Sequence, residues 1–188
     1  MQDNEEKLTR ILDAAADLFA VHPFHKVLLS DIARKAAVGK GTLYLYFKSK
    51  DDLYFQVLFR NFEMLVNQLQ SFIAEADLPA DKLMAGVIDI MVAYLSKRAI
   101  DLGLQGSVMA YPTSEEWSLK RMELWQVIED VIRQGVKEGL FQENNTRLTG
   151  RFITGMIRTS CLFCPEGEDR ESLSKHASEF VLKGLATS

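Results

Sequence analysis

Apolar residues recur along most of the chain with the spacing of amphipathic helices. Between residues 5 and 20 they stand three or four positions apart, on what would be one helix face. These residues are Leu8, Ile11, Leu12, Ala15, Leu18 and Phe19. Pro23 ends this first segment, because proline cannot continue a helix. Two short helical patterns follow, over about 29–36 and 40–46, and a long one then extends to about residue 75.

The same spacing continues towards the C-terminus. After a break at Pro79, it predicts helices over about 81–97, 114–138, 145–162 and 170–185. Between them, the stretch 100–112 contains two glycines, and we expect one or two short helices with loops there. No run has the alternation and the Val, Ile and Thr content of a strand. The pattern therefore predicts an all-α protein.

Composition excludes several other classes of protein. The 188 residues are 47% hydrophobic and 26% charged, which is ordinary for a globular chain. Two cysteines are too few for a disulfide scaffold. The apolar runs are too short to cross a membrane, and the first six residues are too polar for a signal peptide. We therefore expect a cytoplasmic protein with no membrane partner.

Charge changes the picture, because the basic residues gather in one short segment. The whole chain has a net charge of −4. Between Lys26 and Lys50, six basic residues accompany a single acidic one, Asp31, so this segment has +5 and the rest of the chain −9. A compact basic segment in an acidic chain indicates a local contact surface for an anionic partner.

The basic segment also has the pattern of a helix-turn-helix unit. Small and apolar residues are spaced to pack its two short helices together: Ile32, Ala33, Ala36, Val38 and Leu43. The second of these helices can then lie in the major groove of DNA. Five residues are left pointing outward: Lys40, Gly41, Thr42, Tyr44 and Tyr46.

The outward residues have the chemistry needed to contact DNA. Lys40 can bind a phosphate, and the Thr and Tyr hydroxyls can bond phosphate oxygens or base edges. Gly41 permits close approach of the backbone. Lys48 and Lys50 add charge at the start of the next helix, whose free N–H groups also favour a phosphate. A solvated basic face on a three-helix bundle is the alternative interpretation.

The run from Ile32 to Leu53, with Ala14–Ala15 and Leu18–Phe19 upstream, resembles the TetR family of bacterial transcriptional repressors. The motif covers about residues 7–55, and the remainder agrees in helix number and order. The resemblance implies a homodimer that binds a near-palindromic double-stranded operator and is released by a small, largely apolar effector. Residues 1–48 would form the helix-turn-helix domain, and residues 49–188 a helical domain for ligand binding and dimerisation.

Individual residues can be matched to the family motif. By resemblance, Lys40, Gly41 and Thr42 open the recognition helix, and Lys50 holds a phosphate. The full set of predicted DNA-binding residues is Lys26, Ser30, Lys40, Gly41, Thr42, Tyr44, Tyr46, Lys48 and Lys50. Two positions depart from the family: Ala37 stands where Gly is usual, and Gly39 where Ser or Thr would cap the helix.

The rest of the chain is rich in Met and aromatic residues, which suit an apolar ligand cavity and equally a plain core. The predicted ligand-binding residues are Phe62, Met91, Tyr94, Met109, Trp125, Phe152 and Met156. The helices predicted over about 114–138 and 145–162 are the last long pair. In the family, the equivalent pair packs against the same pair of a second subunit, related by a two-fold axis. The predicted dimer residues are Leu124, Ile128, Val131, Ile132, Ile153 and Ile157.

Other functions have less support. Cys161 and Cys164 form a Cys-x-x-Cys run, but the chain offers no second metal-ligand pair and no βαβ context for a redox pair. We therefore expect ordinary thiols, no metal and no cofactor. No catalytic motif is present, so we expect no enzyme. The alternatives are an activator, a ligand-independent DNA-binding protein, and a helical interaction module that has lost DNA binding.

Overall fold

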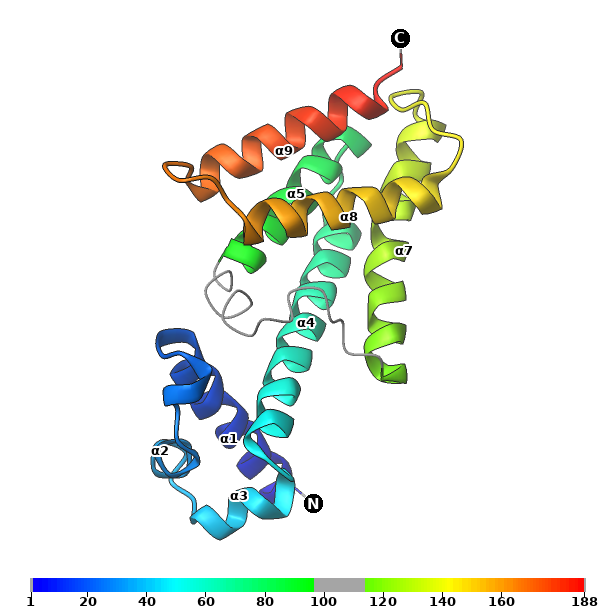
Figure 1. Ribbon diagram of the computed structural model, residues 1–188. Coiled ribbons are helices and arrows are strands. Elements are labelled where there is room, and N and C mark those ends of the chain that lie inside the picture. The colour runs from blue at the N-terminus through cyan, green and yellow to red at the C-terminus, as the bar shows by residue number, and fades with distance from the viewer. Residues whose placement is uncertain (1, 97–113, 188) are drawn as a thin grey trace. The chain divides into compact units, whose positions relative to one another are not determined.

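The computed structural model describes residues 2–96 and 114–187, and Figure 1 shows their arrangement. Within these residues the secondary structure is helical, without a strand, so the all-α prediction is confirmed. The short helices expected over 100–112, and Met109, lie outside the described residues. The elements are α1 (Gln2–Val21), η1 (Phe24–Lys26), α2 (Leu29–Lys35), α3 (Lys40–Tyr46), α4 (Lys50–Glu75), α5 (Ala80–Ser96), α7 (Glu115–Lys137), α8 (Thr146–Leu162) and α9 (Arg170–Leu185).

Packing divides the described residues into two units, and the division falls inside α4. Residues 2–62 belong to the first unit, and residues 63–96 and 114–187 to the second. The division comes later than the boundary expected at residue 48, because Leu53, Tyr54 and Val57 of α4 are buried in the core of the first unit. α4 is therefore a single helix that belongs to both units.

The first unit is a small bundle around one apolar core. Ile11 and Ala15 of α1, Ile32 of α2, Leu43 of α3 and Leu53 of α4 are all fully buried in it. Burial of such side chains is the main favourable term in folding, and here it fixes α3 against its neighbours.

The second unit is built around α5. This helix packs against α7, α8 and α9, and Figure 1 shows α8 crossing it and α9 running alongside it. Its residues Leu83, Met84, Val87 and Ile88 are fully buried. Gly86 allows α4 to approach, because a Cβ there would lie 2.3 Å from the ring of Phe72.

Polar residues begin several of the helices. The side chains of Ser49, Asn145 and Asp169 each accept a backbone N–H three residues ahead, at 2.8–3.1 Å. Ser49 thus caps α4. α3 begins after Gly39 and has no side-chain cap, as the sequence predicts. No helix among the described residues is both long and apolar enough to cross a membrane.

Candidate nucleic-acid interface

A tight turn between α2 and α3 positions the candidate recognition helix. The N–H of Val38 donates to the carbonyl oxygen of Ala33 at 3.0 Å, and that of Ala37 to Arg34 at 3.2 Å. These two bonds form a Schellman motif, which ends a helix with one residue in the left-handed region. That residue is Ala37, with φ of +54°. The chain thus makes without glycine a turn that usually uses one.

The side of α3 away from the core forms an exposed surface. Leu43 points inward and is 1% exposed, whereas Tyr44 is 54% exposed and Leu45 83% exposed. Of the predicted outward residues, Lys40 and Gly41 are also exposed, and Thr42 is half-buried. Space for a partner exists at Gly41, because a Cβ placed there would meet no atom within 4 Å.

Tyr46, the last predicted outward residue of α3, contacts the start of α1. Its hydroxyl lies within hydrogen-bond distance of Asn4 Oδ1 and donates to the carbonyl oxygen of Asn4 at 3.3 Å. The ring is half-buried as a result. The structure therefore gives Tyr46 a role in tying two helices together that the sequence motif does not reveal.

Lys50 holds the segment that precedes α2. Its Nζ donates to the carbonyl oxygens of Phe24 at 2.8 Å and Val27 at 3.1 Å, and lies 4.3 Å from the centre of the Phe24 ring. The same ring packs edge-on against Tyr54 of α4, with ring centres 5.1 Å apart. Two of the three ammonium N–H groups of Lys50 therefore form hydrogen bonds within the chain. Sequence reasoning missed this contact, because η1 has no periodic pattern.

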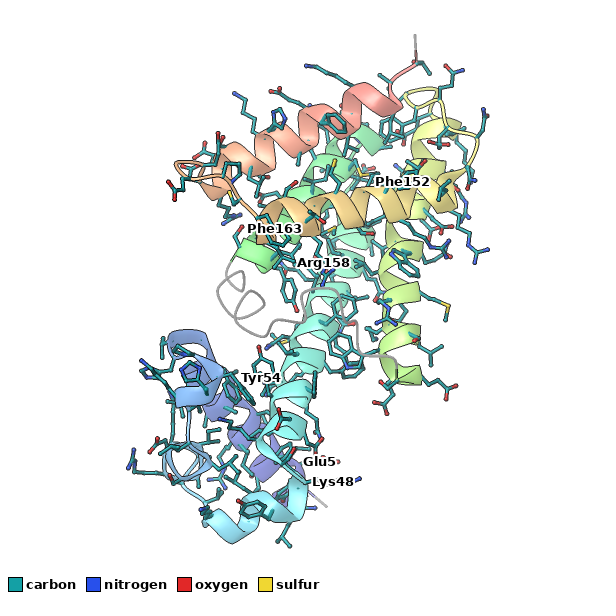
Figure 2. All side chains as sticks on the ribbon, viewed as in Figure 1. Glu5, Lys48, Tyr54, Phe152, Arg158 and Phe163 are labelled. Atoms are coloured by element: carbon teal, nitrogen blue, oxygen red, sulfur yellow. The ribbon has the colours of Figure 1, made fainter. Side chains whose placement is uncertain are left out.

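The remaining predicted phosphate contacts are exposed. Lys26 lies on η1 and Ser30 on α2. Lys48, which is labelled in Figure 2, lies just before α4. Within residues 2–96 and 114–187, Lys26, Lys40 and Lys48 have no ion-pair partner. Arg34 and Lys35, in contrast, pair with Asp31 and Asp17. Of the three lysines, Lys40 and Lys48 belong to the α3 region, since Lys40 is the first residue of α3 and Lys48 follows its end by two residues.

The predicted ligand-binding residues do not all belong to the same packing unit. Met91 is buried, and Tyr94, Trp125 and Met156 are half-buried in the second unit, whereas Phe62 ends the first unit. Trp125 Nε1 donates to Thr154 Oγ1 at 3.3 Å, and its ring lies under the Arg151 guanidinium.

The prediction that Phe152 lines a ligand cavity is wrong. Its ring is 66% exposed and lies on the outer side of α8 (Figure 2). It cannot line an interior cavity there, because its side chain points away from the core of its own unit.

The six predicted dimer residues also require correction. Leu124, Ile128, Val131 and Ile132 of α7, and Ile153 and Ile157 of α8, are all buried in the core of their own chain. They are therefore not available to a partner. A groove between α8 and α9 contains two exposed aromatic side chains, Phe152 and Phe180, and its lining also includes the half-buried Met156 and the buried Val181.

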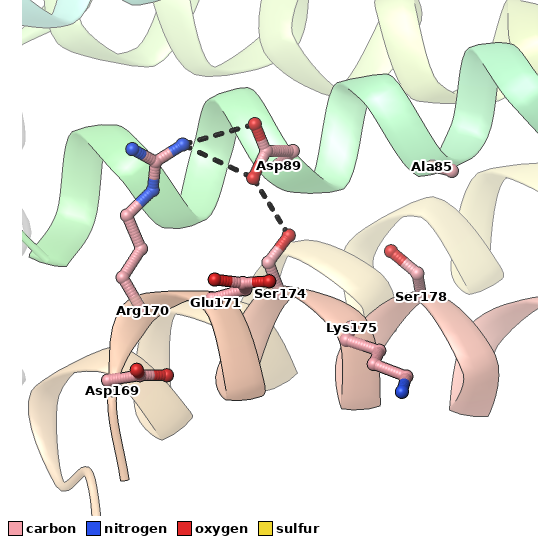
Figure 3. Close-up of a pocket in the computed structure, with 8 residues that line it drawn as sticks. All are labelled: Ala85, Asp89, Asp169, Arg170, Glu171, Ser174, Lys175 and Ser178. Carbon is pink, nitrogen blue, oxygen red and sulfur yellow. Dashed lines mark hydrogen bonds and ion pairs between the residues drawn. The ribbon is translucent and has the colours of Figure 1, made fainter.

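A second, polar pocket lies between α5 and α9 (Figure 3). Arg170 donates to both carboxylate oxygens of Asp89, at 3.1 and 3.2 Å, and Ser174 Oγ donates to the same carboxylate at 3.0 Å. These bonds join the first turns of α9 to the middle of α5. Of the charged residues that line this pocket, Asp89 and Arg170 form an ion pair with each other.

The two cysteines differ in their surroundings. Cys161 is buried at the end of α8, and Cys164 is exposed in the following loop. Burial raises the pKa of the Cys161 thiol to about 11. No cluster of His, Cys, Asp or Glu able to hold a metal ion occurs among the described residues.

Comparison with known proteins gives consistent matches along the chain. The profile of the family described as "Bacterial regulatory proteins, tetR family" matches residues 11–57. A second profile, "Tetracyclin repressor-like, C-terminal domain", matches residues 76–185. The fatty acid metabolism regulator protein of Bacillus subtilis is 26% identical over 200 residues, covering 98% of each chain.

Solved structures show the same fold. The transcriptional regulator FadR from Bacillus subtilis in complex with stearoyl-CoA superposes with a TM-score of 0.75 at 23% identity, covering 94% of this chain and 98% of that one. A transcriptional regulator from Saccharomonospora viridis in complex with choline gives a TM-score of 0.80 at 18% identity, covering 98% and 100%.

Proposed function

The chain belongs to the tetR family of bacterial regulatory proteins, and on this premise we propose that it is a homodimeric repressor of a near-palindromic operator. Membership makes it a DNA-binding, helix-turn-helix regulator of transcription. The finer proposal includes release of the operator when a small, largely apolar effector binds the C-terminal domain. The main support for this proposal is the exposed outer face of α3, which has the exposed Lys40 at its start and the exposed Lys48 just after its end.

DNA recognition rests on the arrangement of charge around this face. Lys26, Lys40 and Lys48 have no ion-pair partner among the described residues, so they can contact phosphates without breaking internal bonds. Tyr44 and Thr42 stand on either side of the exposed centre of α3, where hydroxyls can reach phosphates or base edges. Lys50 adds charge while it holds the backbone near Phe24.

DNA binding is tested by titrating labelled duplex DNA with the full-length protein at about 50 and 200 mM salt. We expect affinity to fall by about a hundredfold or more between the two, because each phosphate contact releases counterions. A protein that binds no duplex at low salt, or whose affinity ignores salt, would contradict the proposal.

Dimer formation is proposed through the groove between α8 and α9. Phe152 and Phe180 are 66% and 62% exposed on it, and large exposed aromatic residues often mark protein interfaces. The double variant Phe152→Ser/Phe180→Ser should sediment as a monomer at concentrations where the wild type is a dimer. Phe163→Ser is the matched control, because Phe163 is equally exposed at the far end of α8 but outside the groove. Loss of the dimer in the control alone would contradict this placement.

We propose that the apolar part of the effector is the chain of a long-chain acyl-CoA, whose CoA part is polar and charged. The support is the relative named for fatty acid metabolism, which aligns over 98% of each chain, and the similar fold of a regulator in complex with stearoyl-CoA. Stearoyl-CoA should weaken operator binding by about 5- to 150-fold, the usual range of allosteric coupling. Free CoA and choline serve as controls. Release by choline and not by stearoyl-CoA would overturn the acyl assignment.

The release mechanism proposed is a change in α4. In the DNA-bound state, the two α3 helices of the dimer lie about 34–36 Å apart, one turn of DNA. α4 runs from Lys50 to Glu75 without glycine or proline, and it belongs to both packing units. An effector with unequal affinity for two positions of α4 would therefore alter the α3 spacing and favour release.

A further inference from the structure

The centre of the exposed face of α3 is apolar. Successive residues of a helix are about 100° apart, so Gly41 and Leu45, each two positions from Leu43, lie about 160° from it on either side. Leu43 is the buried residue of this helix. Gly41 and Leu45 therefore occupy the part of α3 that would reach deepest into a groove, with Thr42 and Tyr44 beside them.

Leu45 has no role inside the protein that accounts for its position. Its side chain is 83% exposed, the highest value among the large exposed hydrophobic residues that the structure describes. Its neighbour on this face, Gly41, leaves open space around its Cα. An aliphatic side chain exposed to water contributes a favourable hydrophobic free energy only when a partner covers it.

We propose that Leu45 is a specificity-determining residue that reads the methyl group of thymine in the major groove. Among the base edges in that groove, thymine alone presents an apolar group, its C5 methyl, while the other features are hydrogen-bond donors and acceptors. A leucine can discriminate only by such an apolar contact. Gly41 supports it by letting the backbone of α3 come close to the bases. This inference rests on the proposed DNA binding through α3.

The test begins with an operator selected from random duplex DNA by the full-length wild-type protein. Each thymine of the selected site is then replaced by deoxyuridine, which removes only the methyl group. At one position per half-site, we expect affinity to fall about fourfold for each methyl removed, the value for one buried carbon. In the Leu45→Ala variant, that position should show no difference between thymine and deoxyuridine.

Three further variants make the result specific. Leu45→Met keeps an apolar side chain and should keep the methyl dependence. Leu28→Ala removes another exposed leucine, which lies before α2 and not on α3, and should also keep it. Thr42→Ser removes the other methyl group beside the face. If Thr42→Ser abolishes the dependence and Leu45→Ala retains it, the reader is Thr42 and the inference is wrong.

The outcomes separate this inference from the function on which it rests. If the wild-type protein selects no operator, DNA binding itself fails. If it selects an operator whose thymine methyl groups have no effect on affinity, the role of Leu45 is overturned while DNA binding stands. Thermal unfolding of each variant confirms that the substitution has left the fold intact.

Discussion

Ala37 concentrates local backbone strain at the turn between α2 and α3. Among the described residues it is the one non-glycine residue with positive φ, a conformation that brings Cβ close to the following carbonyl. α7 ends with the same Schellman pattern, where the N–H of Leu140 donates to Gly135 at 2.9 Å. There the corresponding residue is Gly139, with φ of +75°. Two identical turns thus use different residues, and this allows the strain to be measured.

We predict that Ala37→Gly raises the free energy of unfolding by about 0.5–1 kcal/mol, because relief of strain exceeds the added entropy of the unfolded chain. The reverse change, Gly139→Ala, should lower it by about 1 kcal/mol. Urea unfolding followed by circular dichroism measures both. A lower midpoint for Ala37→Gly would show that the turn is not strained.

Gly41 is the opposite case, a residue whose use is not explained by the fold. Its surroundings would accept a methyl group, and glycine lowers helix stability relative to alanine. Gly41→Ala should therefore stabilise the protein by up to about 1 kcal/mol and weaken operator binding by about 5- to 150-fold, through overpacking against DNA. Unfolding and DNA titration on one preparation test both effects. Unchanged affinity would mean that α3 does not approach DNA along this side.

At the scale of elements, helix ends are held by residues from other helices. The carboxylate of Glu138, just after α7, accepts the backbone N–H of Ala80 at the start of α5, with a distance of 2.8 Å. This bond, assisted by one from Gln134, lowers the pKa of Glu138 below its usual 4.5. The contact therefore links α5 to α7 through a charge.

The lowered pKa gives this contact a pH dependence. A carboxyl group with a lower pKa in the folded state stabilises the protein above its unfolded pKa, and this contribution disappears as pH falls. We predict that Glu138→Gln lowers the melting temperature at pH 7 and reduces its fall between pH 5 and 3.5. Glu179→Gln, at an exposed glutamate on α9, is the control. An identical acid profile in wild type and Glu138→Gln would contradict the role of the charge.

Most helices could be predicted from the sequence, because their apolar residues repeat with a helical period and Pro or Gly separates them. The spacing of Ile32, Ala33 and Leu43 likewise predicted how α2 packs on α3, and these residues are buried together. The bonds from Lys50 to Phe24 and from Tyr46 to Asn4 could not be predicted, since they join residues far apart in sequence.

The buried face of α8 could not be assigned from the sequence either. Phe152 and Ile153 are adjacent and both apolar, yet one is exposed and the other buried. A helix with apolar residues on opposite sides gives no single stripe from which to assign its inner face. Phe152, which was predicted to line a ligand cavity, therefore lies outside, and Ile153 and Ile157, which were predicted to face a partner, lie inside.

At the scale of the whole molecule, charge distribution controls how the protein meets DNA. The segment from Lys26 to Lys50 has a net charge of +5 in a chain whose total is −4. In the proposed dimer this segment occurs twice. The acidic remainder repels phosphates, so contact should be confined to the two basic segments.

We predict that the logarithm of operator affinity falls with the logarithm of salt concentration with a slope of about −5, from three lysines in each of two protomers. Lys48→Ala should make this slope shallower by about 2, one contact per protomer, and should weaken binding to all sequences alike. Lys175→Ala removes an exposed charge on α9 and should leave the slope unchanged. An equal effect from both variants would indicate long-range charge and not a phosphate contact.

Because the two thiols differ in exposure, a spectroscopic label can be attached selectively to the native protein. Burial raises the pKa of the Cys161 thiol to about 11, so this thiol is protonated at pH 7 and is also shielded from reagents. Cys164 is exposed three residues later. A maleimide spin label or fluorophore should therefore attach to the loop between α8 and α9 without any mutation. In a dimer the two labels would form a molecular ruler, whose length could be followed as DNA or effector is added.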